Sequence, residues 1–320
     1  MRGEFDFINY IKERHKLKAI GDDCSVIPTD GLTDQLFTVD LLIENVDFRL
    51  DWTTPSFLGH KALAVSLSDV AAMGGTPKFA LLSLGLPDSL WKTSFLDEFY
   101  EGWHSLAGTY GVELAGGDIS KAGELVIDSF VIGEVPRGKA LLRSGAKPGD
   151  LIFVTGELGG ASLGLSLLEN GMRPGDELAD FHRDAILRQL KPTPQVAIGK
   201  SLLENQLATS AIDLSDGISS DLFHICQASN VGAILDASNL PIAKEATLEM
   251  ALNGGEDFEL LFTVPPERRL NAQQLGCTEV GKIADNSDGI RVQIDSETRP
   301  LVPRGFEHFR RQQRGDRGDP

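Results

Sequence analysis

The sequence is poor in the residues that build disulfide frameworks, zinc sites and histidine-based catalytic centres. Its 3 cysteines, Cys24, Cys226 and Cys277, are isolated, and none has the CxxC spacing of a zinc or redox site. The 6 histidines include no HExxH motif and no cluster of metal ligands. These absences disfavour a disulfide-stabilised secreted domain, a zinc enzyme and a histidine-based hydrolase. They favour a reduced, cytoplasmic protein.

Long hydrophobic runs and positive charge are also scarce. No apolar stretch approaches the ~20 residues of a membrane span, and MRGEFDFINYIKERHK at the start lacks the apolar core of a signal peptide. The formal net charge of −17 at pH 7 disfavours nucleic acid and anionic membranes as partners. It leaves phosphate ligands open, because divalent cations bridge protein carboxylates to phosphates.

Strand-like and helix-like segments alternate along most of the chain, which predicts an α+β protein of two domains. The turn cluster GAKPGD (145–150) lies near the expected boundary. We predict an N-terminal domain at 1–140, a C-terminal domain at 141–310 and a disordered polar tail at 311–320. Expected strands cover 36–43, 78–86, 124–135, 151–156, 232–236, 256–264 and 279–284, and expected helices cover 55–74, 89–110, 159–170, 180–190, 194–206 and 217–228.

Acidic residues recur at positions where a carboxylate is costly. The segment AIDLSDGISSDL (211–222) places Asp213, Asp216 and Asp221 between an apolar approach and a predicted helix. Capping of that helix would make such acids tolerable, and so would a bound cation. Asp69 lies on the apolar stripe of its predicted helix, where a buried carboxylate needs a cation or several hydrogen-bond donors.

Three further segments place acids beside glycine or at the ends of elements. Asp40 interrupts an apolar strand with Thr38 on the same face, GDDCSV sets Asp22 and Asp23 in a turn, and AGGDIS ends a predicted strand near Asp118. Each segment alone has an ordinary explanation as a water-facing edge or a turn. Together they predict a Mg²⁺ site, because Mg²⁺ prefers oxygen ligands and bridges to substrate phosphates. The ligands expected from this pattern are Asp23, Asp40, Asp69, Asp118, Asp213 and Asp216.

The order of these motifs resembles that of the thiamine-monophosphate kinases, in the aminoimidazole ribonucleotide synthetase-like superfamily. The resemblance runs from about residue 3 to residue 309 and rests on GDDCSV, VDLLIENVDF, HKALAVSLSDVAAMGGTPKFALLSLGLP, AGGDIS, LLRSGAKPGD, AIDLSDGISSDL, GGEDFELLFTVP and GFEHF. It implies in-line phosphorylation of thiamine monophosphate to thiamine diphosphate, with ATP as co-substrate and several Mg²⁺ ions. It also implies a homodimer whose N-terminal sheet domains pair into a β-barrel, with a C-terminal α/β sandwich.

The resemblance further implies roles for individual residues. The implied metal ligands are Asp23, Thr38, Val39, Asp40, Asp69, Asp118, Asp213 and Asp216. The implied ATP contacts are Gly117, Asp118, Arg143 and Ser215, with Arg143 and Asp216 also assisting the transfer, and the implied acceptor contacts are Asp47, Glu256 and Phe306. Tyr100 is a further candidate ATP contact, placed by its distance before GGD and not by a motif. A phosphate monoester has a second pKa of about 6, so the acceptor is already an anion at neutral pH and needs no general base. The scarcity of candidate catalytic histidines agrees with this chemistry.

Two positions depart from the family pattern. Val39 precedes Asp40 and lacks a hydroxyl near the expected metals, although its backbone carbonyl is available as a ligand. Asp47 stands where a histidine that contacts the substrate is expected, which exchanges a donor for a carboxylate. The second departure bears on acceptor recognition more than on ATP binding.

Other members of the superfamily are the first alternative. A selenophosphate synthetase would carry a reactive cysteine ahead of GDD, whereas Cys24 follows it, and a hydrogenase-maturation dehydratase would end in a cysteine-bearing tail. An aminoimidazole ribonucleotide synthetase would phosphorylate an amide oxygen, and the segments LLRSGAKPGD and GGEDFELLF argue against it. The alternative from another class is a nucleotide-binding protein without catalysis. Its clustered acids would then destabilise the fold by repulsion without a compensating use.

Overall fold

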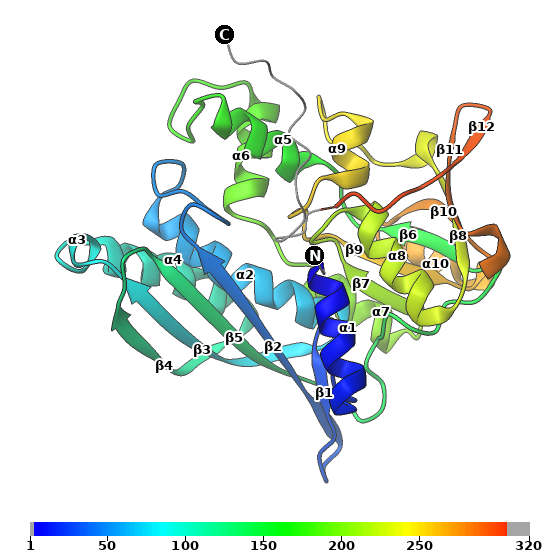
Figure 1. The fold of residues 1–320 in the computed structure, drawn as a ribbon, viewed down its shortest axis with the longest axis horizontal. Helices are drawn as coiled ribbons and strands as arrows, with labels where there is room; N and C mark the ends of the chain where they lie inside the picture. The colour runs from blue at the N-terminus through cyan, green and yellow to red at the C-terminus, as the bar shows by residue number, and fades with distance from the viewer. Residues whose placement is uncertain (1–2, 306–320) are drawn as a thin grey trace.

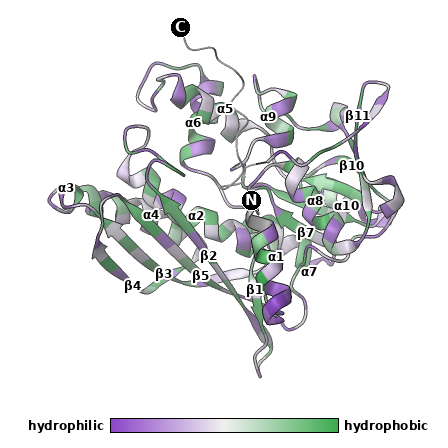
Figure 2. Cartoon of the chain, in the orientation of Figure 1, coloured by the Kyte–Doolittle hydropathy of each residue, from purple (hydrophilic) through white to green (hydrophobic). Residues whose placement is uncertain are grey.

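Alternation of apolar and polar residues builds the first of two mixed sheets. The computed structural model describes residues 3–305, and the sheet of its first half has the order β1-β2-β5-β3-β4 (Figure 1). β3 and β4 are parallel, and the other neighbours are antiparallel. Alternating hydrophobic and polar bands are visible along these strands (Figure 2). The strands are β1 (Ser25–Ile27), β2 (Thr33–Ile43), β3 (Thr76–Leu86), β4 (Glu113–Lys121) and β5 (Val126–Pro136).

A buried helix covers one face of this sheet. The helix α2 (Pro55–Ala72) begins at Thr54, whose hydroxyl accepts the N–H of Phe57 at 3.2 Å, and it lies between the sheet and helix α4 (Phe95–Tyr110). Most of its residues are buried, so both helix faces take part in packing. The remaining helices of this half are α1 (Glu4–His15) and α3 (Asp88–Trp91).

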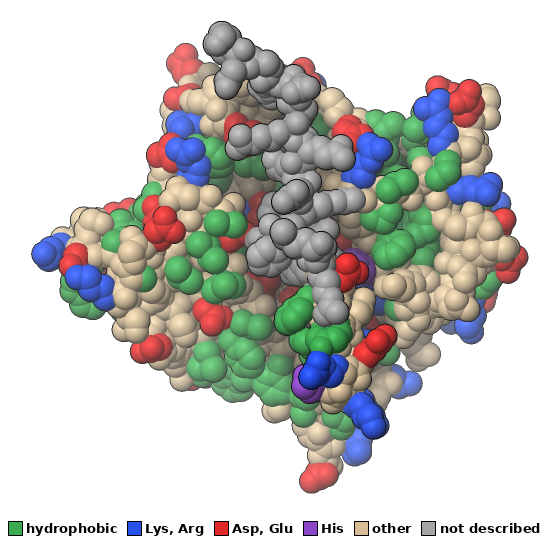
Figure 3. Space-filling model, viewed as in Figure 1, with side chains coloured by type: hydrophobic (Ala, Val, Ile, Leu, Met, Phe, Trp, Pro, Cys, Tyr) green, Lys and Arg blue, Asp and Glu red, His purple; other side chains and the backbone are tan. Residues whose placement is uncertain are grey.

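The other face of the first sheet carries exposed apolar side chains. Val39, Leu41, Phe79 and Leu81 are all exposed, with Val39 at 60%. Figure 3 shows hydrophobic side chains gathered at the lower left, over this sheet. An apolar sheet face of this kind is typical of an interaction surface.

The second half of the chain forms a mixed seven-stranded sheet. Its order is β12-β11-β8-β10-β6-β9-β7, with β11 parallel to β8 and the other pairs antiparallel. The strands are β6 (Leu151–Val154), β7 (Ser210–Asp213), β8 (Gly232–Asp236), β9 (Leu260–Val264), β10 (Thr278–Ala284), β11 (Ile290–Ile294) and β12 (Glu297–Pro300). The helices are α5 (Gly160–Glu169), α6 (Asp180–Leu190), α7 (Val196–Glu204), α8 (Ile218–Ser229), α9 (Leu248–Asn253) and α10 (Arg269–Gln274), with 3₁₀ turns η1 (Ala237–Asn239), η2 (Pro266–Arg268) and η3 (Asn286–Asp288).

Helix α2 also joins the two halves. It packs against α7 and β7 of the second half, and α7 approaches it so closely that a Cβ at Gly199 would lie 2.0 Å from the Ala71 carbonyl oxygen. The largest hydrophobic core therefore contains residues of both halves, including Leu67 from α2 and Phe262 from β9. This shared core fixes the relative position of side chains that α2 and β7 present to each other.

Most of the expected elements are confirmed, and three are wrong in detail. The expected helix 89–110 is divided into α3 and α4, where Thr93 caps both the end of α3 and the start of α4. AGGDIS lies inside β4 instead of ending a strand. The expected strand 256–264 begins only at Leu260, because Glu256 and Phe258 have positive φ angles of 65° and 50°. No helix among residues 3–305 is long and apolar enough to span a membrane. The expected disordered tail at 311–320 lies outside the described residues.

Candidate active site

Three carboxylates from distant parts of the chain converge where the two sheets meet α2. Asp23 lies in the turn before β1, Asp69 lies near the end of α2, and Asp213 is the last residue of β7. One oxygen from each lies within 4.8 Å of the others. In the sequence these residues are separated by dozens of positions, so only the packing of α2 between the sheets brings them together.

Hydroxyl groups on α2 and β2 orient the carboxylates. Ser68 Oγ donates to Asp213 Oδ2 at 2.7 Å, and Thr38 Oγ1 donates to Asp69 Oδ2. A fourth acid, Asp40, accepts a hydrogen bond from Ser66 Oγ at 2.6 Å. Neutral donors hold the carboxylate oxygens in place without cancelling their charge.

The electrostatics of this cluster disfavour the charged form of its carboxylates. Burial, followed by the neighbouring Asp23, raises the pKa of Asp213 to about 8. Burial also raises the pKa of Asp69 well above its ordinary value, and Asp40 and Asp213 raise it further. Asp23 Oδ2 is buried and has no hydrogen-bond partner within the described part of the chain. Oxygen ligands that are clustered, oriented and short of positive charge fit a hard divalent cation.

Arg143 reaches this cluster from the segment that links the two domains. Its Nη2 lies 2.5 Å from Asp23 Oδ1 and its Nε lies 3.2 Å from the same oxygen, while its backbone N–H donates to Asp22 Oδ1 at 2.8 Å. The guanidinium is mostly buried, with 21% of its side chain exposed. Arg143 is thus the cation that the structure places against the acids, and its fork geometry also suits phosphate oxygens.

The loop AIDLSDG is folded back on itself by a further acid. The buried Asp221 accepts the N–H groups of Asp216 and Gly217 through Oδ2, at 3.3 and 3.0 Å. Gly217 has φ 108°, and a Cβ there would lie 2.8 Å from the Gly254 carbonyl oxygen. The tight approach brings the loop against GGED, whose Glu256 donates its N–H to the Ser215 carbonyl at 2.8 Å. Asp216 and Ser215 are thereby fixed next to Asp213.

A second polar group lies on the same helix α2, toward its start. Lys61 is buried, with Nζ 2.9 Å from Glu256 Oε1 and 3.1 Å from the Gln189 carbonyl oxygen. The side chain of Gln189 donates to the other carboxylate oxygen of Glu256. Glu256 keeps 30% of its side chain exposed, so it faces space that a ligand can enter.

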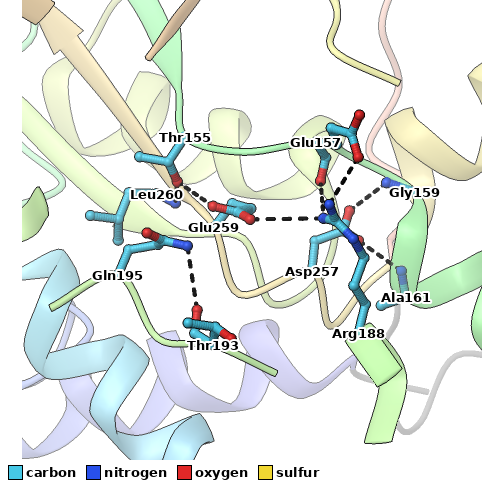
Figure 4. Close-up of polar contacts among 10 residues, drawn as sticks. All are labelled: Thr155, Glu157, Gly159, Ala161, Arg188, Thr193, Gln195, Asp257, Glu259 and Leu260. Carbon is cyan, nitrogen blue, oxygen red and sulfur yellow. Dashed lines mark hydrogen bonds and ion pairs between the residues drawn. The ribbon is translucent and has the colours of Figure 1, made fainter. Parts of the chain in front are cut away.

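A third polar group surrounds a cavity of about 320 Å³ between α6 and the segment 257–259, which precedes β9. Figure 4 shows Arg188 between Glu157 and Glu259, and Asp257 directed at the start of α5. Asp257 accepts the N–H groups of Gly159 and Ala161, at 2.6 and 3.0 Å. These contacts give Asp257 and Arg188 a structural role, and they distinguish the pair from the acids of the Asp23–Asp69–Asp213 cluster.

Comparison with known proteins assigns the family. Residues 21–135 match the model of the AIR synthase related protein, N-terminal domain, and residues 147–293 match that of the C-terminal domain. Thiamine-monophosphate kinase of Bacillus subtilis is 38% identical and matches 96% of this chain and 99% of its own length, and that of Escherichia coli K12 is 39% identical over 91% of both. The chain belongs to the thiamine-monophosphate kinase family.

A solved structure supports the same assignment. The structure described as AaThiL complexed with AMPPCP and TMP is 36% identical, has a TM-score of 0.87, and covers 97% of this chain and 99% of that chain. The resemblance and the two-domain fold inferred from the sequence are confirmed.

Not every predicted metal ligand joins the cluster within one chain. Along the cross-strand rows, Asp40 lies level with Ser129, Leu82 and Gly117, whereas Asp118 is one position further and directs its side chain to the opposite face. The strands β2 and β4 are three spacings apart, about 14 Å. Asp118 is exposed at that edge of the sheet and does not reach the Asp23–Asp69–Asp213 cluster.

The side chain of Val39 also faces away from the carboxylates, because it alternates with Thr38 and Asp40 along β2.

Gly117 has a packing role in addition to any contact with phosphate. A Cβ there would lie 1.9 Å from the Leu82 carbonyl oxygen of the neighbouring strand.

The remaining predicted contacts are distributed over three elements. Tyr100 lies on α4, half-buried, with its ring edge-on to Phe99. Asp47 accepts the N–H of Ile43 at 2.8 Å and so closes the loop after β2. Phe306 lies outside the described residues.

Sequence reasoning missed the residues that position the site. Ser66, Ser68 and Lys61 look like ordinary positions of a helix, and Gln189 lies in a segment without a motif. The sequence does mark the three residues of α2, because each is a polar residue on a helix that is apolar almost all round, and such a residue needs a buried partner. The sequence places Asp221 in the same segment as Asp213 and Asp216, but its local pattern does not predict its role in folding the loop.

Proposed function

We propose that this protein transfers the terminal phosphoryl group of ATP to the phosphate of thiamine monophosphate, forming thiamine diphosphate and ADP. The observation that carries the proposal is the convergence of Asp23, Asp69 and Asp213 beside Arg143. Relatives matched over nearly their whole length bear the name of this activity. The acceptor phosphate is its own nucleophile, so a site of acids and one guanidinium, without a general base, is sufficient.

The acids fit Mg²⁺, which when bound neutralises the phosphates and lines up attacking and leaving oxygens. In this assignment Asp23, Asp69 and Asp213 are ligands, and Thr38 and Ser68 hold two of these carboxylates in position. Asp40 and Asp216 complete the acidic wall, with Val39 contributing only its backbone carbonyl. Arg143 contacts Asp23 through Oδ1, and in this assignment its guanidinium turns from that oxygen to the phosphate oxygens of ATP. The nucleotide is contacted by Ser215, Tyr100 and Gly117.

The acceptor lies on the side of Glu256 in this assignment. Its cationic thiazolium ring is complemented by the Glu256 carboxylate and stacks on Phe306. A charged pocket wall and an aromatic face select a cationic ring over a neutral one. Specificity for the acceptor therefore depends on residues other than the metal ligands.

The exposed apolar face of the first sheet supports a homodimer in which two such sheets close into a β-barrel. Asp118 lies on that same face. In a dimer it would reach a second copy of the chain, which reconciles its role as a ligand with its distance from Asp40. Sedimentation or light scattering of the purified chain measures the oligomeric state, and a monomer at all concentrations contradicts this arrangement.

Product analysis tests the activity directly. The purified protein is incubated with ATP, Mg²⁺ and thiamine monophosphate, beside one control without an acceptor and another with thiamine. We expect thiamine diphosphate and ADP in equal amounts, and neither product in the control without acceptor. ADP formed without thiamine diphosphate would mean that the acceptor is a different molecule. Absence of both would favour the non-catalytic alternative.

Variants of Asp47 test whether the carboxylate at this position, where the family pattern has a histidine, affects binding of the acceptor. A carboxylate near an anionic acceptor repels it, so Asp47→His is expected to lower the KM for thiamine monophosphate by about threefold to tenfold. The KM for ATP should stay the same. Asp47→Asn is the matched control, since it removes the charge and keeps an oxygen for the N–H of Ile43. An unchanged KM in both variants would show that Asp47 acts only on its own loop.

A further inference from the structure

Lys61 is a buried cation outside the metal cluster, and nothing in the phosphoryl transfer uses it. Its side chain is only 3% exposed, and Nζ pairs with Glu256 Oε1 at 2.9 Å. The same Nζ donates to the main-chain carbonyl of Gln189 at 3.1 Å. A buried ammonium is costly without such partners, so its presence calls for a use.

The partners of Lys61 lie on the other domain. Lys61 belongs to α2, whereas Gln189 lies in the last turn of α6 and Glu256 precedes β9. Both oxygens of Glu256 are engaged, one by Lys61 and one by the side chain of Gln189. The backbone of Glu256 is also held, because its φ of 65° is unusual for this residue type and its N–H donates to the Ser215 carbonyl.

Helix α2 connects this group to the metal cluster. Lys61 and Ser68 are seven positions apart and share one face of the helix, about 10 Å apart along its axis. Ser68 holds Asp213, and Lys61 holds Glu256. A rigid helix thus fixes the interval between the carboxylate that binds metal and the carboxylate that faces the acceptor.

We propose that Lys61 is a positioning residue for the acceptor, which holds the Glu256 carboxylate at a set distance from the metal cluster so that it meets the cationic ring while the acceptor phosphate meets the metal end. The inference rests on the proposed function. In the absence of Lys61 the partly exposed carboxylate turns toward water, where hydration weakens its attraction for the ring.

The test is steady-state kinetics of Lys61→Met in the full-length protein, which replaces the ammonium by an apolar side chain of similar length. The KM for thiamine monophosphate is expected to rise about tenfold, with the KM for ATP unchanged. Inhibition is measured with an analogue of thiamine monophosphate in which carbon replaces the thiazolium nitrogen, so that the ring is uncharged and the phosphate is kept. Its inhibition constant is expected to stay the same, because the analogue lacks the charge that Glu256 complements.

Two further variants keep the test decisive. Gln189→Met removes the other donor to Glu256, and a smaller rise in the same KM is expected. Lys200→Met is the matched control, because Lys200 pairs with Glu204 at 3.7 Å on the exposed surface of α7. Thermal unfolding of Lys61→Met, Gln189→Met and Lys200→Met is compared with that of the wild type.

The outcomes separate the inference from the proposed function. Equal weakening of the cationic and neutral acceptors, a parallel rise in the KM for ATP, or tighter binding of thiamine monophosphate by Lys61→Met would each overturn the inference and leave the activity intact. A wild-type chain that forms no thiamine diphosphate would overturn the proposed function and this inference with it.

Discussion

Asp69→Asn is expected to lower Mg²⁺-dependent formation of thiamine diphosphate by about 10²–10³-fold, the size of effect seen when a preorganised charge-stabilising group is lost. The amide keeps the shape of the side chain and can still accept the hydrogen bond from Thr38. It removes one of the three carboxylates that lie within 4.8 Å of one another. Initial rates over a range of Mg²⁺ concentrations measure the change.

The same variant should fold at least as well as the wild type without metal. Asp40 and Asp213 raise the pKa of Asp69 beyond what burial does, so a neutral side chain relieves repulsion. Asp180→Asn is the control, because Asp180 is 96% exposed at the first residue of α6 and is not part of the acidic cluster. Near-normal turnover of Asp69→Asn at low Mg²⁺ would remove Asp69 from the metal site.

The second large effect is an opposite response of stability to pH with and without Mg²⁺. The pKa of Asp213 is raised to about 8 and that of Asp40 to about 6, with burial as the main cause of both shifts. The folded protein therefore holds protons that the unfolded chain releases above its ordinary carboxyl pKa near 3.8. Without metal, the contribution of these protons to stability is fully present below pH 3.8 and is lost as the pH rises through the folded-state pKa values of about 6 and about 8. We expect the metal-free Tm to fall by about 5 °C from pH 6 to pH 8.5.

Divalent cations reverse this dependence, because they bind the deprotonated carboxylates and compete with protons. Mg²⁺ at about 100 times its dissociation constant adds about 2.7 kcal/mol, and its effect on Tm should be larger at pH 8.5 than at pH 6. Thermal unfolding with EDTA and with Mg²⁺ measures both curves. In Asp69→Asn the metal-free decline should be shallower. A metal-free Tm that rises from pH 6 to pH 8.5 would contradict the electrostatic description of the cluster.

The sequence by itself determined the class of fold, the family and most of the acids. Period and composition placed α2 within two residues of its observed end, and the helix starts where it was expected because Thr54 and Pro55 are local start signals. The acids stood out because Asp69 occurs in an apolar helix and Asp40 in an apolar strand. Such features are read from neighbours along the chain and need no knowledge of the packing.

Tertiary structure alone decided which acids meet. Asp118 shares the glycine-rich motif of a phosphate site, yet the pleat directs it to the opposite face from Asp40, and one residue of register makes that difference. The strand expected at 256 begins later because Glu256 has a positive φ, and this residue contacts Lys61 and Ser215 instead of a neighbouring strand. Lys61 and Glu256 are nearly two hundred positions apart. No local pattern encodes such a pair, because its formation depends on how α2 is packed between the two domains.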